Sequence, residues 1–115
     1  MKLFFVAVAT LVLLVPAAAQ DHAGHGAMSA ASPATQAYMD ANRTMHEDMA
    51  IDYSGDPDID FIRAMLPHHQ GAVAMARIVL EHGKDPEVKA LAQDIVAAQE
   101  KEIAWMQAWL AEHAD

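Results

Sequence analysis

The sequence predicts an all-α protein, an antiparallel bundle of three helices joined by short turns. Three times along the chain a capping residue stands immediately before a proline, which is a common start of a helix. Between these starts, apolar residues recur at steps of three and four, and no stretch shows the alternation of a strand. The three starts are Ser32-Pro33, Asp56-Pro57 and Asp85-Pro86. We therefore expect a single helical domain over residues 32–115.

The first 31 residues differ in composition from the rest of the chain. Lys2 is followed by an apolar run over residues 3–15 and then by small residues up to Ala19. This is the pattern of a signal peptide over residues 1–19, and the run is too short to span a membrane. We expect cleavage after Ala19 and export as a soluble periplasmic protein without a membrane anchor. Residues 20–31 are mostly small and predict a flexible tail.

The first helix is expected to run from Pro33 to about Tyr53. Its stripe at helical spacing is built from methionine and tyrosine rather than from leucine and isoleucine. The stripe consists of Tyr38, Asn42, Met45, Met49 and Tyr53, with Met39 and His46 beside it. Methionine defines core packing poorly, so this choice is unusual for a helix with a purely structural role.

The second helix is expected over about residues 57–83 and the third over about residues 86–112. Pro67 lies inside the second helix, where a proline removes a backbone hydrogen bond and costs about 3 kcal/mol. Gly71, one turn later, adds a further penalty. Either this geometry is kept for a site on a continuous helix, or two shorter helices meet in a loop at Pro67.

Composition and charge exclude several classes of function. The chain of 115 residues has no cysteine, so it depends on helix packing, metal binding or association rather than on disulfides. Its formal net charge of −9 argues against nucleic acid as a partner, because the phosphates would repel it. Three helices bury a modest core, and a homodimer could complete a larger bundle.

Seven histidines and eight methionines are many for a chain of this length and indicate metal binding. Imidazole nitrogen and thioether sulfur together suit copper, and the sulfur favours Cu(I). Candidates in two helices lie at spacings that place them on one helix face. They are Met45, His46 and Met49 in the first helix, and Met65, His68, His69 and Met75 in the second. The structural alternative is that these methionines fill the core.

The predicted tail carries the same types of ligand. His22, His25 and Met28 follow one another at three-residue spacing. After cleavage behind Ala19, His22 would be the third residue of the mature chain. It could then join the free amine and backbone nitrogens around Cu(II), which favours square-planar geometry. The alternative is an inert linker.

Gln99 and Glu102 interrupt the apolar stripe of the third helix. A carboxylate on a buried face needs a charged or hydrogen-bonding partner, and a histidine of the second helix could provide one. We expect both residues to support the ligand imidazoles from behind, as carboxylates commonly do at metal sites. The alternative is that Glu102 points to solvent.

Three segments of the chain carry motifs that belong together. They are Met45-His46-x-x-Met49, then Asp60-Phe61-x-x-Met65-Leu66-Pro67-His68-His69-Gln70-Gly71-Ala72, and finally Gln99-x-x-Glu102-Ile103-x-x-Met106-x-x-Trp109-Leu110. With these segments, the chain resembles the family of exported helical proteins named domain of unknown function 305. The resemblance implies a ferritin-like helical bundle and, as in its CopM-type members, copper binding in the periplasm. By position it also implies ligand roles for the helical candidates above and for Met106.

The expected function is therefore the capture, buffering or delivery of copper in the periplasm, without catalysis. The expected partners are metal ions, a second copy of the chain and a copper-handling protein. A Met-rich module that binds another protein is one alternative. A ferritin-like metal oxidase is less favoured, because di-iron bundles use Glu-x-x-His pairs and no glutamate here has a histidine three residues later.

Overall fold

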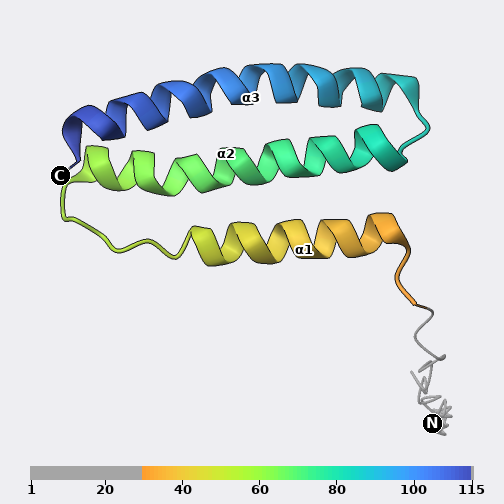
Figure 1. Ribbon diagram of the computed structural model, residues 1–115, viewed down its shortest axis with the longest axis horizontal. Coiled ribbons are helices and arrows are strands. Elements are labelled where there is room, and N and C mark those ends of the chain that lie inside the picture. The colour runs from red at the N-terminus through yellow and green to blue at the C-terminus, as the bar shows by residue number, and fades with distance from the viewer. Residues whose placement is uncertain (1–29, 115) are drawn as a thin grey trace, which may run out of the picture.

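The computed structural model describes residues 30–114 and confirms the all-α fold. Its helices are α1 (Pro33–Asp48), α2 (Pro57–His82) and α3 (Pro86–His113), and no strand occurs within residues 30–114. The helices lie side by side, each antiparallel to the next (Figure 1). None of these helices is long and apolar enough to cross a membrane. The predicted signal peptide and the predicted tail as far as residue 29 lie outside the described residues.

Each helix begins where a side chain caps it. The side-chain oxygens of Ser32, Asp56 and Asp85 accept hydrogen bonds of 3.1, 2.9 and 2.8 Å from backbone N–H groups in the first turn. A proline follows each cap, at a position where the missing N–H has no partner in the helix in any case. The predicted starts of all three helices are therefore confirmed.

α1 ends at Asp48, earlier than the predicted end near Tyr53. The reason lies in α2, where the Asp60 carboxylate accepts hydrogen bonds from the Ser54 N–H (2.7 Å), the Ser54 hydroxyl (2.8 Å) and the Gly55 N–H (3.1 Å). These bonds, the one from the Ser54 N–H foremost, hold the pKa of Asp60 below its usual value. Gly55 has φ +89°, which favours glycine. The connection is thus tied to the first turn of α2 and leaves the helical path.

α2 is the central helix of a single layer. It packs against α1 on one side and α3 on the other, whereas α1 and α3 do not contact each other (Figure 1). The core is correspondingly thin, and none of the side chains described is both large and fully buried. Its most buried apolar residues are Ile62, Val73 and Ala76 in α2 and Ala92 and Met106 in α3.

α2 continues through Pro67 without interruption, so the alternative of two shorter helices is wrong. Pro67 and Gly71 line the contact between α2 and α1, together with Met45. A Cβ atom at Gly71 would lie 2.5 Å from Met45 Sδ and 2.8 Å from its Cγ, so the glycine allows α1 to approach closely. The glycine thus serves helix packing, and its expected role in shaping a metal site stays a prediction.

Candidate metal site

A groove of about 270 Å³ between α2 and α3 brings three of the predicted ligands together. Met65 and His69 line it from α2, and Met106 lines it from α3. We call it the His69 groove, and its lining is Phe61, Ile62, Met65, His69, Glu102, Trp105 and Met106. It combines two thioether sulfurs, one imidazole and one carboxylate with apolar walls.

His69 is fixed at both nitrogens. Its side chain is 12% exposed, with Nδ1 2.9 Å from the carbonyl oxygen of Met65 and Nε2 2.5 Å from Oε2 of Glu102. A carbonyl oxygen and an ionised carboxylate can only accept hydrogen bonds. Nδ1 therefore carries the hydrogen in its contact with Met65, and Nε2 faces the carboxyl group of Glu102. Glu102 is itself 61% exposed.

This arrangement determines how a metal can reach His69. Nδ1 is held by the backbone of α2, so Nε2 is the nitrogen through which His69 can bind a metal. A metal bound there would take the place of the contact between Nε2 and Glu102, because imidazole coordinates in its neutral form. The expected contact between Glu102 and a central histidine is thus present. However, Glu102 faces the position that the metal would take and does not support the ring from behind.

Gln99, the other residue expected to support the imidazoles, lies one turn before Glu102 on α3. Its Oε1 atom is buried and has no hydrogen-bond partner within the part of the chain that the structure describes. Gln99 is not among the residues that line the His69 groove. The structure therefore leaves its predicted role as a prediction.

The two adjacent histidines point in different directions. Successive residues of an α-helix are about 100° apart around its axis. The ring centroids of His68 and His69 are 6.2 Å apart, with planes inclined at 61°. His69 turns toward α3, whereas His68 is exposed. Only one of the pair therefore enters the groove.

The remaining predicted ligands lie elsewhere. Met45 packs between α1 and α2, while His46 and Met49 are exposed at the C-terminal end of α1. Met75 lines a different groove. Because α1 and α3 lie on opposite sides of α2, the structure does not bring the helical candidates to one point. The tail candidates His22, His25 and Met28 lie outside the described residues.

Within residues 30–114, no three histidine, aspartate or glutamate side chains come together as a possible metal site. The His69 groove adds thioether sulfur to one imidazole and one carboxylate. Of the two largest apolar walls, Phe61 belongs to the family motif given above, but Trp105 was not among the predicted residues; they are 60% and 58% exposed. Helical spacing could have identified Trp105, because it follows Glu102 by three residues.

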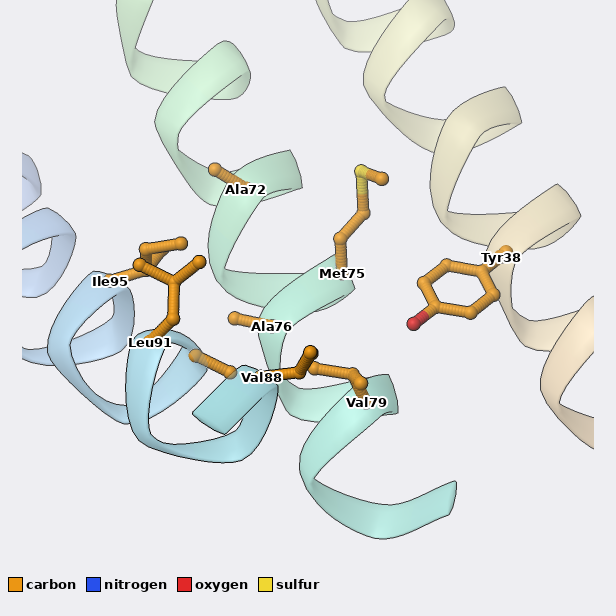
Figure 2. Close-up of a pocket in the computed structure, with 9 residues that line it drawn as sticks. Tyr38, Ala72, Met75, Ala76, Val79, Val88, Leu91 and Ile95 are labelled. Atoms are coloured by element: carbon orange, nitrogen blue, oxygen red, sulfur yellow. The ribbon is translucent and has the colours of Figure 1, made fainter. Parts of the chain in front are cut away.

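A second groove of about 360 Å³ lies toward the other end of α2 and α3. We call it the Leu91 groove. In Figure 2, Leu91 and Ile95 approach from α3 and Tyr38 from α1, with Met75 and Val79 of α2 between them. Its lining is almost entirely apolar and contains no histidine.

Two comparisons with known proteins gave matches, and the family match covers α2 and α3. The profile of the family described as "Domain of unknown function (DUF305)" matches residues 58–115. An uncharacterized protein of Acanthamoeba polyphaga mimivirus is 38% identical over 55 residues, which are 48% of this chain and 36% of the relative. The chain thus spans about a third of the length of that relative. The Met45-His46-x-x-Met49 segment of α1 lies outside the family match.

Proposed function

Because the chain belongs to the family described as domain of unknown function 305, a description that states no activity, we propose a function from its own residues. The protein binds copper in the periplasm, where it captures, buffers or delivers the ion without catalysing a reaction. The observation that carries this proposal is the His69 groove, in which Met65, His69 and Met106 line one cavity.

The chemistry of the groove fits Cu(I). Thioether sulfur is a soft ligand and imidazole suits copper, so the two together favour Cu(I) over hard cations. The groove, of about 270 Å³, leaves room for one ion between these side chains. Met65, His69 and Met106 would therefore hold the ion, and the apolar walls would limit the access of water to it.

The other predicted ligands would extend this role. Glu102 supplies a hard oxygen ligand, which suits Cu(II) or Zn²⁺ better than Cu(I). The helical candidates outside the His69 groove remain predicted ligands for further ions: Met45, His46, Met49, His68 and Met75. The tail candidates would capture Cu(II) and pass copper on, to the groove or to a copper-handling partner. Mass spectrometry of the mature N-terminus checks the cleavage on which this last step depends.

An anaerobic Cu(I) titration against a competing chelator tests the proposal. His69→Ala removes the imidazole, while Met65→Leu and Met106→Leu remove sulfur at nearly constant volume. We expect each change to weaken Cu(I) binding at least about tenfold. His82→Ala is the matched control, because this histidine at the end of α2 lies outside the groove. Wild-type affinity in His69→Ala and in both methionine variants would refute the proposed site.

A further inference from the structure

One face of the α2–α3 pair carries a second set of helix-packing residues. On α2, the residues at alternating steps of four and three are Phe61, Met65, His68, Ala72, Met75 and Val79. On α3, the same spacing selects Leu91, Ile95, Ala98, Glu102, Trp105 and Trp109. We call these sets the α2 seam and the α3 seam. Alternating steps of three and four are the spacing along which one helix packs against another over many turns.

Most of both seams is left uncovered by the chain itself. α2 packs against α3 through neighbouring positions, where Ile62 and Val73 are each 7% exposed. By contrast, Phe61 on the α2 seam is 60% exposed, and Leu91 and Trp105 on the α3 seam are 59% and 58% exposed. Seam residues line both the His69 groove and the Leu91 groove. The two seams therefore form one open, largely apolar face along α2 and α3.

We propose that a second copy of the chain covers this face, so that α2 and α3 of two copies form an antiparallel four-helix bundle. The face consists of two antiparallel helices. A two-fold axis that lies in the plane of the interface places each seam of one copy opposite a seam of the other copy, and both have the same residue spacing. Four-helix bundles are built from such pairs of antiparallel helices. The one-layer fold, with its thin core, thereby gains the second layer that a domain normally has.

The area of the face agrees with this partner. α2 has 26 residues and is therefore about 39 Å long. Two helices at about 9 Å separation then present roughly 700 Å². Stable complexes bury about 800 Å² on each partner, whereas the largest apolar patch of a monomer is commonly about 300–600 Å². The face thus has the size of an interface.

The charges also permit contact between identical faces. The formal net charge of −9 would oppose association if the carboxylates lay on the face. Among the seam residues only Glu102 is acidic, and its carboxylate already contacts His69. All other carboxylates of α2 and α3 lie outside the two seams. A second copy therefore meets little like charge.

The dimer also completes the metal site, a part of the inference that depends on the proposed function. His68 is exposed in the single chain but occupies the middle of the α2 seam, next to Met65. In the dimer, His68 of one copy is covered by the face of the other. The second copy thereby closes the His69 groove and adds an imidazole nitrogen to the sulfur and nitrogen ligands already there.

The oligomeric state of the metal-free protein, measured by sedimentation equilibrium at micromolar concentration, tests the dimer. We expect a dimeric mass for the wild type. Leu91→Glu and Phe61→Glu place a charge at positions that are mostly exposed in the single chain but buried in the dimer. Each should raise the dimer dissociation constant at least about a hundredfold while the helical circular dichroism at 222 nm stays unchanged. Ala97→Glu, at an exposed position outside both seams on α3, is the matched control and should remain dimeric.

A monomeric wild type with full helix content, or a Leu91→Glu variant that dimerises as tightly as the wild type, would overturn the inference. A Cu(I) titration then tests the proposed copper binding separately from the dimer. The monomeric Leu91→Glu variant should bind Cu(I) at least about tenfold more weakly than the wild type. The His68→Ala variant should show the same loss of Cu(I) affinity although it remains a dimer. If the wild type is a dimer that ignores Cu(I), the copper proposal fails and the dimer stands. If monomeric Leu91→Glu binds Cu(I) like the wild type, the shared site is refuted.

Discussion

Replacing Gly71 with alanine should weaken the contact between α1 and α2. The added Cβ would lie 2.5 Å from Sδ, 2.8 Å from Cγ and 3.1 Å from Cβ of Met45. The sulfur can move by rotation of the side chain, but the Met45 Cβ atom moves only with the backbone of α1. Relief of the overlap therefore requires both a new methionine rotamer and a shift of the helix.

The expected magnitude is a balance of two terms. Alanine in a helix interior is more favourable than glycine by about 0.8–1 kcal/mol. Overpacking a contact of this kind costs typically about 1–3 kcal/mol. We therefore expect Gly71→Ala to lower the free energy of unfolding by about 1 kcal/mol. In the background of Met45→Ala the clash with sulfur and Cγ is gone, so the same substitution should become stabilising by up to about 1 kcal/mol.

Urea unfolding followed by circular dichroism measures the effect of Gly71→Ala on the free energy of unfolding in both backgrounds. The double-mutant cycle of Gly71 and Met45 should give a coupling of about 1–3 kcal/mol. Met49→Ala is the control partner, because Met49 is a methionine at the end of α1 that is 37% exposed and is not among the atoms close to Gly71. If Gly71→Ala stabilises the wild type and its coupling with Met45 equals that with Met49, then α1 does not pack on α2 as described.

Three further predictions concern single side chains. Glu102→Ala should weaken Zn²⁺ binding at least about tenfold but change Cu(I) binding less than about threefold, because the carboxylate is a hard ligand; equal effects on both ions in parallel titrations would contradict this. The pKa of Asp60 is lowered in the folded protein by hydrogen bonds from the connection before α2, so its contribution to stability is present above the usual pKa of about 4 and is lost as the pH falls below it. The stability difference between the wild type and Asp60→Asn should therefore be constant near neutral pH and shrink below about pH 4 in acid titrations of unfolding. Asp85→Ala removes the cap of α3 and should cost about 1 kcal/mol in thermal unfolding, whereas Arg77→Ala breaks only an exposed ion pair with Glu100 and should cost less than about 0.5 kcal/mol.

The parts of the fold that depend on local signals were predictable from the sequence. Caps followed by proline determine where each helix starts, because these interactions involve residues within one turn. The end of α1 was not predictable in this way. Tyr53 continues the stripe of the first helix, but the carboxylate that holds the connection away from the helical path belongs to Asp60 in the next helix. The antiparallel three-helix arrangement was predicted, but not that α1 and α3 each contact only α2, because an apolar stripe does not say which helix it meets.

In the candidate site, too, some contacts were predictable from the sequence, whereas others depend on how the helices pack. The contact of a central histidine with Glu102 followed from the need of a carboxylate for a partner. The sequence did not indicate whether His68 or His69 faces α3, because this depends on the rotation of α2 about its axis. It also suggested that Met45 joins the central residues, whereas α1 packs on the opposite side of α2 from α3.

Because α1 contacts α2 but not α3, it can separate from the rest of the protein more easily than α2 and α3 can separate from each other. α1 contributes no buried residue, so its separation from the rest uncovers less apolar surface than opening of the α2–α3 pair. Amide hydrogens of α1 should therefore exchange with solvent sooner than those at the centre of α2. Tyr38 of α1 forms one wall of the Leu91 groove (Figure 2). Each local opening of α1 thus widens that groove while α2 and α3 stay together.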